Sequence, residues 1–383
     1  MLKGNKGEWS EIYVFLKLLA EGRLNAADSN LNSLTDIYYP IIKILRHEAN
    51  IEREYVLNGK IKIIDGNSNI LLLEIPIIDF VQKSQQLFRN LKNAKGSSFS
   101  FPEIETFLNN IDVKSLSALS TEKSDIRLVV HDLNTGLKPT LGFSIKSLIG
   151  GNSTLFNAAA GTNFIFKLTK PPRLKFDLEQ FNNYTYSQSK SSKKLSKISL
   201  RLNELEKMQF TVLFNKIQSD ILNLNLRLID SQLPEILAYL VYCKYKTGKS
   251  KLSELLKEIN IQNPLNFDTS EGHPFYEYKI KNFLTDSALG MTPETVWTGN
   301  YDASGGIIIV KENGDIVCYH ICNKNEFQNY LMNNTKFEEP STSEDANNPG
   351  FAKTIKPKPY KFSWIYKENN ELFIKLNLQI RFI

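Results

Sequence analysis

Three polar residues, Asp125, Ser144 and Lys146, have the types and spacing of a site that hydrolyses phosphodiesters. Residues 126–131 and 141–147 are short runs rich in apolar and β-branched side chains, and the segment between them contains the Gly and Pro of a turn. The pattern predicts two strands of one hairpin. Asp125 comes directly before the first strand, and the other two residues lie on the second.

The alternation along the second strand separates a polar face from an apolar one. Side chains at i and i+2 share a face of a strand, so Ser144 and Lys146 project together while Phe143 and Ile145 face a core. A carboxylate at the start of the preceding strand lies beside this polar pair across the hairpin. We therefore predict that Asp125 converges with the serine and the lysine at one edge of a sheet.

Phosphodiester hydrolysis needs a hard divalent cation to neutralise charge on the phosphate and a group that orients or deprotonates water. Asp125 suits the first task, and Lys146 suits the second. Mg²⁺ keeps several of its own waters and usually takes one or two protein carboxylates, so a sparse site is adequate. The backbone carbonyl of Ile145 offers a further oxygen ligand. Mg²⁺ is the predicted cofactor.

The same residues carry a resemblance to a known family. Asp125 followed by Ser144-x-Lys146 is similar to the PD-(D/E)xK nuclease motif with serine in place of the second acid. The stretches KGEWSEIYVFLKLLAEG, YYPIIKILR, SDIRLVVHDLNTG, GFSIKS and STLFNAAAGTNFIF together resemble the HpaII restriction endonuclease family, over roughly the first 170 residues. The resemblance implies a type II restriction enzyme that cleaves double-stranded DNA at the palindrome CCGG, a homodimer, and a companion methyltransferase that acts on the same site.

The sequence departs from the nuclease motif at the second acid, which leaves the site one negative charge short. In related folds this charge can come from a helix after the lysine strand or from the first helix. Residues 148–165 contain no Asp or Glu, whereas a predicted helix from Gly7 to Gly22 carries Glu8 and Glu11 near its start. We favour Glu11, with Glu8 second. The alternative is that both acids only complement the helix macrodipole.

A local excess of positive charge predicts where DNA binds. Ten basic and four acidic residues lie between Lys167 and Lys207, which accounts for the whole net charge of +6. A basic stripe attracts a phosphate backbone, although a solvated Lys/Ser loop gives the same pattern. The residues predicted to contact phosphates are Arg173, Lys190, Lys193, Lys194, Lys197 and Arg201; those predicted to read base edges are Ser153, Asn157, Thr162 and Asn163.

Other patterns indicate structure rather than chemistry. Cys318, His320 and Cys322 share one face of a predicted strand, with Cys243 elsewhere, but positions about 6.6 Å apart suit zinc chelation poorly. Gly150-Gly151 lacks the lysine of a phosphate-binding loop. His131 and Asp132 end the first strand of the hairpin, where they satisfy hydrogen bonds of the turn or approach DNA.

The organisation of the chain predicts an α/β (α+β) nuclease core with a mixed sheet flanked by helices, and a mixed C-terminal portion. We place the core at 1–186, a basic linker or loop at 187–199, and a portion for DNA binding or dimerisation at 200–383. Hairpins are predicted at Asn58-Gly59 with a type I′ turn, at Asn313-Gly314 and near Asn369-Asn370. The further predicted helices cover 78–91, 102–111, 154–160, 200–214, 233–245, 251–259 and 274–284; the further strands cover 37–45 and 163–168.

Composition narrows the class of protein. With 383 residues, 42% of them hydrophobic, the chain can bury a large core. No apolar run approaches the roughly 20 residues that span a bilayer, and the start lacks a signal-peptide core, so no membrane partner is predicted. Three cysteines indicate a reducing compartment, and we predict a bacterial cytoplasmic location. The rival functions are a DNA-binding protein without catalysis and a repair or nicking nuclease.

Overall fold

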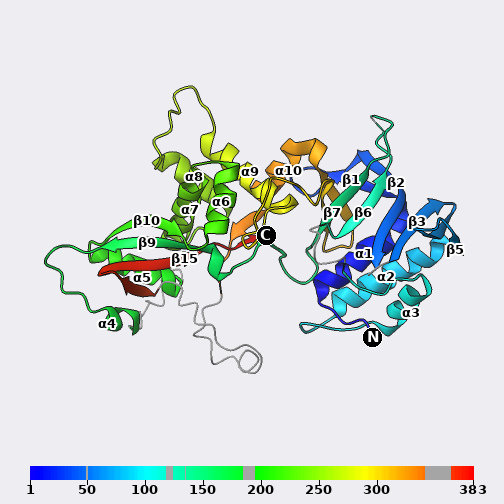
Figure 1. Ribbon diagram of the computed structural model, residues 1–383, viewed down its shortest axis with the longest axis horizontal. Coiled ribbons are helices and arrows are strands. Elements are labelled where there is room, and N and C mark those ends of the chain that lie inside the picture. The colour runs from blue at the N-terminus through cyan, green and yellow to red at the C-terminus, as the bar shows by residue number, and fades with distance from the viewer. Residues whose placement is uncertain (49–50, 118–123, 134, 184–194, 341–363) are drawn as a thin grey trace. The chain divides into compact units, whose positions relative to one another are not determined.

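The computed structural model describes residues 1–48, 51–117, 124–133, 135–183, 195–340 and 364–383 (Figure 1). They form two compact units, each made of segments that alternate along the sequence. The first contains Met1–Ser153, Thr285–Gly290 and Gly299–Leu331, and the second contains Thr154–Leu284, Met291–Thr298 and Met332–Ile383. The described residues 154–183 belong to the second unit, although the core is predicted to extend over 1–186.

The first unit is built on a mixed sheet of nine described strands, in the order β1-β12-β11-β7-β6-β2-β3-β4-β5, with β1 also paired to β2. Strand β7 runs parallel to β11 and antiparallel to β6, which confirms the predicted mixed sheet. The strands are β1 Arg23–Ala27, β2 Ser33–Glu48, β3 Ile51–Asn58, β4 Lys60–Asp65, β5 Leu71–Ile75, β6 Ile126–Val130, β7 Thr140–Ser147, β11 Gly306–Val310 and β12 Ile316–His320.

Three helices, α1 Lys6–Glu21, α2 Ile77–Asn93 and α3 Pro102–Asn110, lie together beside this sheet (Figure 1). They and the sheet share one core, in which Trp9, Phe15, Tyr55 and Phe143 are almost fully buried. Burial of such aromatic side chains is a main source of stability. This core fixes α1 against the sheet and so determines where the acids of α1 lie.

The first helix begins and ends where the sequence predicts. Asn5 caps its N-terminus, and its side chain accepts a hydrogen bond from the backbone of Glu8, whose own side chain accepts one from the Asn5 backbone. Gly22 closes the helix with φ +67°, a left-handed conformation that glycine adopts at low cost.

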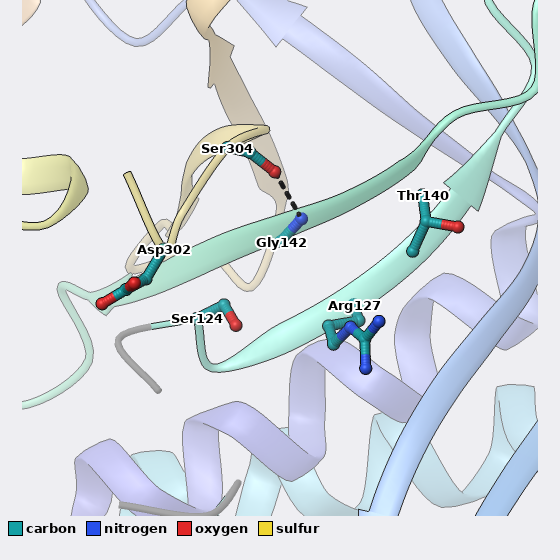
Figure 2. Close-up of a pocket in the computed structure, with 6 residues that line it drawn as sticks. All are labelled: Ser124, Arg127, Thr140, Gly142, Asp302 and Ser304. Carbon is teal, nitrogen blue, oxygen red and sulfur yellow. Dashed lines mark hydrogen bonds between the residues drawn. The ribbon is translucent and has the colours of Figure 1, made fainter. Parts of the chain in front are cut away.

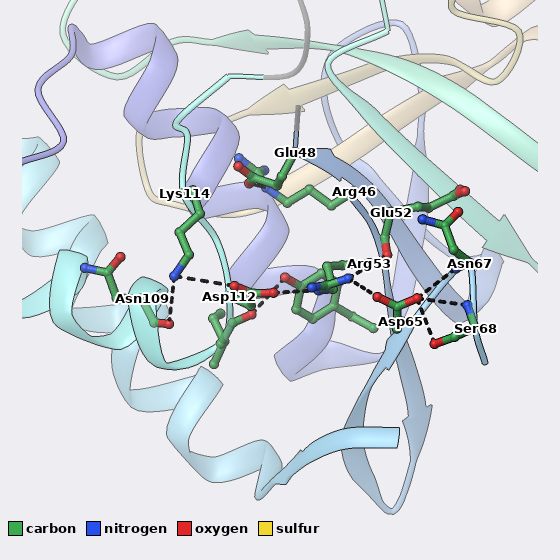
Figure 3. Close-up of polar contacts among 12 residues, drawn as sticks. Arg46, Glu48, Glu52, Arg53, Asp65, Asn67, Ser68, Asn109, Asp112 and Lys114 are labelled. Atoms are coloured by element: carbon green, nitrogen blue, oxygen red, sulfur yellow. Dashed lines mark hydrogen bonds and ion pairs between the residues drawn. The ribbon is translucent and has the colours of Figure 1, made fainter. Parts of the chain in front are cut away.

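An ion-pair cluster fastens β3 and β4 to the loop after α3. The guanidinium of Arg53 lies 2.5 Å from carboxylates of both Asp65 and Asp112 (Figure 3). Beside it, Arg46 on β2 pairs with Glu48 at 2.6 Å. Pairs that are this enclosed hold their side chains more firmly than exposed ones do. Arg46 is thereby held at the side of the sheet that faces α1.

The second unit combines helices with two smaller sheets among the described residues, ordered β10-β9-β15-β14 and β13-β16-β8. Its strands are β8 Thr154–Phe156, β9 Asn163–Thr169, β10 Thr211–Ile217, β13 Thr335–Phe337, β14 Ile365–Glu368, β15 Glu371–Asn377 and β16 Ile380–Phe382; its helices are α4 Leu178–Asn183, α5 Lys197–Lys207, α6 Asp220–Ile229, α7 Leu233–Thr247 and α8 Leu252–Gln262. The helices α9 Phe275–Leu289 and α10 Lys324–Asn333 and the short 3₁₀ turns Ala160–Thr162 and Ile321–Asn323 complete the described elements.

Two predicted helices are wrong because pairing between distant strands overrides local preference. Residues 154–156 form strand β8, which pairs with β16, rather than a helix over 154–160. The helix predicted over 200–214 ends at Lys207; the chain reverses at Gln209 with φ +57° and enters β10, which pairs with β9. The helix α6 was missed, although its apolar residues recur at helical spacing.

The turns confirm the hairpins but correct one turn type. Asn369 and Asn370 both have positive φ, as a type I′ turn requires, between β14 and β15. At Asn58-Gly59 only the glycine has positive φ, and Asn58 pairs directly with Lys60, so the predicted type I′ turn is wrong there. Most of the predicted linker lies outside the described residues, and α5 already begins at Lys197.

Candidate active site

Asp125 and Ser144 meet at the margin of the first unit's sheet, where β6 begins beside β7. The backbone N–H of Asp125 donates to the Phe143 carbonyl at 2.8 Å. Its carboxylate accepts hydrogen bonds from the Ser144 hydroxyl at 3.1 Å and from the Ile145 N–H at 2.5 Å. These two bonds fix the direction of the carboxylate. The hairpin therefore brings these two residues together as the alternation pattern suggested.

Lys146 lies two residues farther along β7, on the face that carries Ser144. It is half-buried, opposite Ile309 of β11. None of the described residues forms an ion pair or hydrogen bond with its ammonium group. A cation on this face, without a described carboxylate partner, is available to a bound anion or a water molecule.

The Ile145 carbonyl lies on the same strand edge as Asp125. In a strand, the N–H and C=O of one residue point to the same side, and this direction alternates from residue to residue. The Phe143 carbonyl and the Ile145 N–H both bond to Asp125, so the Ile145 carbonyl also points to the side where β6 begins. This orientation is what its predicted role as an oxygen ligand requires.

Glu11 comes to the same margin from α1. The helix is tied to β7 by a hydrogen bond of 2.9 Å between the hydroxyls of Ser10 and Ser147. Burial raises the pKa of Glu11 to about 8, and the negative charge of Asp125 adds to the rise, against the opposing effects of Arg46 and Ser117. Its Oε2 atom is enclosed and has no hydrogen-bond partner among the described residues. The Glu11 carboxyl is therefore close enough to Asp125 to be affected by its charge, and one of its oxygens is buried without a partner among the described residues.

Glu8, one turn earlier, has a different environment. Its carboxylate accepts the Asn5 backbone N–H at 2.7 Å in the capping box of α1. A carboxylate engaged in this way stabilises the helix start and has less freedom to bind an ion. The pattern Asn5-x-x-Glu8 is itself a capping signal in the sequence.

These groups fit a hard divalent cation. An enclosed carboxylate oxygen without a partner, next to a second carboxylate, lacks the positive charge that a cation supplies. No cluster of three or more His, Cys, Asp and Glu suited to a metal occurs within the described parts of the chain. A site with two carboxylates and one carbonyl is sparse, yet it suits Mg²⁺, which usually takes only one or two protein carboxylates.

The residues predicted to bind DNA are scattered. Asn163 is buried, and its amide bonds to Gln218 and Asn377 at 3.0 and 2.8 Å. Arg201 is buried and donates to the Asn182 carbonyl at 2.8 Å. Such burial argues against DNA contacts for these two. Of the others, Asn157, Arg173 and Lys197 are exposed, Ser153 is half-buried with an enclosed hydroxyl, Thr162 is buried, and Lys190, Lys193 and Lys194 lie outside the described residues.

The remaining candidates serve the fold. Asp132 holds its own turn, since its carboxylate accepts the Thr135 hydroxyl at 2.8 Å. Cys318 is fully buried, and the His320 ring accepts the Cys322 N–H at 3.0 Å. The residues that sequence reasoning missed are Arg46 and Ser117, which act on Glu11. No local pattern marks them, because they reach α1 only through the tertiary fold.

The first unit thus has a mixed sheet with Asp125 and Ser144 at its margin, an arrangement consistent with an α+β nuclease-like fold. A sequence model of the HpaII restriction endonuclease family matches residues 5–382. The chain is 43% identical over 381 residues to the type II restriction enzyme HpaII of Haemophilus parainfluenzae, a match that covers 99% of this chain and 98% of that protein. No solved structure gives a significant match.

The chain therefore belongs to the HpaII restriction endonuclease family, and it is a restriction enzyme, a site-specific deoxyribonuclease. The match extends the resemblance seen in the first 170 residues to nearly the whole chain. No helix within the described parts has the length and apolar character needed to cross a membrane.

Proposed function

We propose that this chain cleaves double-stranded DNA at a short palindrome by Mg²⁺-dependent hydrolysis, with Asp125, Ser144, Lys146 and Glu11 as the catalytic group. The observation that carries the proposal is the enclosed, partnerless oxygen of Glu11 beside the Asp125 carboxylate. A purely structural role would leave this arrangement unfavourable, because burial and the Asp125 charge both oppose ionisation of Glu11, and one of its oxygens has no hydrogen-bond partner among the described residues.

Asp125, Glu11 and the Ile145 carbonyl would hold the cation. Once bound, a divalent cation neutralises charge on the scissile phosphate and lowers the pKa of a bound water. Ser144 is a poor metal ligand, and it acts instead through its hydrogen bond of 3.1 Å, which orients Asp125. The Ile145 N–H restrains the same carboxylate from the backbone side.

Lys146 has the remaining role. Its ammonium group projects on the face of Ser144 and is not paired with any described carboxylate. It can therefore stabilise negative charge on the phosphate and orient the attacking water. Glu8 supports this chemistry only indirectly, by fixing the start of the helix that carries Glu11.

Membership of the family supports the finer proposals. The relative is a type II restriction enzyme, and we propose that this chain shares the recognition sequence CCGG implied by the resemblance. A palindrome presents two equivalent half-sites, which a symmetric homodimer engages equally. A companion methyltransferase would shield the host's own sites without forming a stable complex with this chain.

The test uses supercoiled plasmid of known sequence with and without Mg²⁺. The wild-type chain is expected to give linear fragments with fixed ends, and sequencing those ends identifies the recognition site. Lys146→Ala is expected to lower the cleavage rate by roughly 10²–10⁴-fold while binding of the same DNA persists. Lys257→Ala, which removes an exposed lysine of α8, is the matched control and should cut like the wild type.

Two outcomes decide against the proposal. Binding without cleavage by the wild-type chain, at any Mg²⁺ concentration, indicates a DNA-binding protein that has lost catalysis. Nicked circles without linear fragments indicate a nuclease that attacks one strand. Equal cleavage by Lys146→Ala and the wild type would remove Lys146 from the catalytic group.

A further inference from the structure

A polar pocket of about 370 Å³ lies beside the candidate active site in the first unit. It is lined by Ser124, Arg127, Thr140, Gly142, Asp302 and Ser304 (Figure 2). Ser124 directly precedes the Asp125 of the site, and Gly142 precedes Ser144 by two residues. The pocket is lined by charged and hydroxyl groups, so it suits a polar ligand rather than an apolar one.

Strand register places this pocket on the catalytic face of the sheet. Thr140, Gly142, Ser144 and Lys146 alternate along β7 and share one face, and Arg127 of β6 lies directly opposite Gly142. Gly142 is about 6.6 Å from Ser144 along the strand, because each residue advances about 3.3 Å. The major groove of DNA is about 8.5 Å deep. A base edge next to a phosphate at the active site is therefore within reach of the pocket.

The loop that carries Asp302 is held close to the strand. Gly305 donates to the Gly142 carbonyl at 2.7 Å, and Gly142 donates to the Ser304 hydroxyl at 3.3 Å (Figure 2). A Cβ atom on Gly142 would lie 2.7 Å from the Asp302 carbonyl and 2.8 Å from the Ser124 Cβ. Glycine is thus needed for this close approach, which sets Asp302 in place before any ligand arrives.

The two charged residues of the pocket are not used by the fold. No described residue pairs with the guanidinium of Arg127 or with the carboxylate of Asp302, although they line the same pocket. A pocket built for phosphate would not include a carboxylate, because the negative charges repel. A donor fork together with an acceptor matches the edge of a base pair, since Arg bonds guanine O6 and N7 and Asp accepts from the cytosine amino group.

We propose that this pocket reads a G·C base pair of the recognition site, with Arg127 on guanine and Asp302 on cytosine. The inference rests on the proposed function, since it gives that function part of its specificity. It adds base-reading residues that none of the sequence patterns indicated. It also assigns sequence recognition to the same sheet face that carries the catalytic group, so that correct reading and cleavage depend on one rigid element.

The test measures equilibrium binding to short duplexes at fixed salt without divalent metal. One duplex carries the cleavage site mapped for the wild type, one set carries single base-pair changes in it, and one carries an unrelated sequence. Arg127→Lys keeps the charge but loses the bidentate fork, and Asp302→Asn loses the acceptor charge. Each should weaken cognate binding by roughly tenfold to a hundredfold and change unrelated binding by less than about threefold. Arg89→Lys, at an exposed position of α2, is the matched control.

The decisive pattern is position-specific. For each variant, one particular G·C pair should no longer matter for affinity. Changing that pair should weaken binding by the wild type but hardly alter binding by the variant. An equal loss of affinity for all duplexes would indicate a phosphate contact and would overturn the proposal. The proposal would also be overturned if both variants discriminated between the duplexes as the wild type does. A wild-type chain without sequence preference overturns the proposed function as well, whereas preference that survives in both variants overturns only the pocket assignment.

Discussion

Each compact unit buries an ionisable side chain, but the surroundings of the two are opposite. In the first unit, burial raises the pKa of Glu11 to about 8, and the carboxylate of Asp125 adds to this effect. In the second unit, burial lowers the pKa of Lys244 to about 8, and Glu339 and Glu338 oppose the shift. Glu11 thus faces a like charge, whereas Lys244 has a carboxylate 3.8 Å from its ammonium group and lies over the Tyr245 ring.

The difference separates a functional group from a structural one. Both side chains lose water on burial, and favourable partners offset part of that cost at both: Arg46 and Ser117 at Glu11, and Glu339 at Lys244. Only Glu11 also has a like charge nearby, that of Asp125. The Asp125 charge makes ionisation of the buried Glu11 still less favourable, which gives the fold no benefit. A bound cation would explain why the two carboxyl groups are placed in this way. Energetically the two residues should behave alike on substitution, and only Glu11 should affect cleavage.

The largest expected effect is the loss of cleavage in Glu11→Gln. The amide keeps the shape but removes the charge that would bind the cation, so we expect the cleavage rate to fall by roughly 10²–10⁴-fold. Calorimetric titration with Mg²⁺ alone should show weaker binding by at least about tenfold. Cleavage at the wild-type rate with undiminished Mg²⁺ affinity would place the metal elsewhere and return Glu11 to a structural role.

The next effect concerns stability as a function of pH. The pKa of Glu11 is raised by folding, so between pH 4.5 and 8 the unfolded chain loses this proton while the folded chain keeps it. The free energy of unfolding therefore falls by about 1.4 kcal/mol for each unit by which the pH rises within this window.

Urea denaturation of the wild type and Glu11→Gln without metal, at pH 5 and pH 8.5, isolates this contribution. The variant should match the wild type at pH 5 and exceed it by on the order of 3 kcal/mol at pH 8.5. Parallel curves for the two proteins would show that Glu11 is ionised at little cost, contrary to its enclosed position.

Lys244→Met sharpens the comparison from the other unit. Replacing a buried charge with an apolar side chain of similar volume removes the desolvation cost, so we expect the protein to be about 1–3 kcal/mol more stable at pH 7. This gain should shrink above pH 8, where the folded wild type no longer carries the charge. Cleavage should stay within about twofold of the wild type. A large loss of cleavage by folded Lys244→Met would end the distinction between the two buried groups.

What the sequence can predict depends on how far apart along the chain the interacting residues lie. Asp125 and Ser144 lie on one hairpin, so alternation and turn composition were enough to predict that they meet. The mixed sheet and most helices were also readable from local periodicity. The strands β8 and β10 could not be predicted in this way. Strand β8 pairs with the distant β16, and β10 pairs with β9 after the chain reverses at Gln209.

The position of Glu11 is the part that no local pattern could supply. It depends on α1 packing against β7, through Ser10 and Ser147, which are 137 residues apart. The charge shortage at Ser144 pointed to the first helix, but only the packing shows which acid turns toward Asp125. Arg127 and Asp302 illustrate the same limit, since they line one pocket from segments that no motif connects.

Glu8→Gln is expected to have the smallest effect, and it tests the assignment most directly, because Glu8 lies one helical turn from Glu11. Its carboxylate accepts the Asn5 N–H, so the neutral amide weakens a charge-assisted cap bond and should lower the free energy of unfolding by about 0.5–1 kcal/mol. Cleavage by the folded variant should remain within about threefold of the wild type, with unchanged Mg²⁺ affinity. If Glu8→Gln instead abolished cleavage at full stability, the metal would bind at the helix start, and the enclosed oxygen of Glu11 would need another explanation.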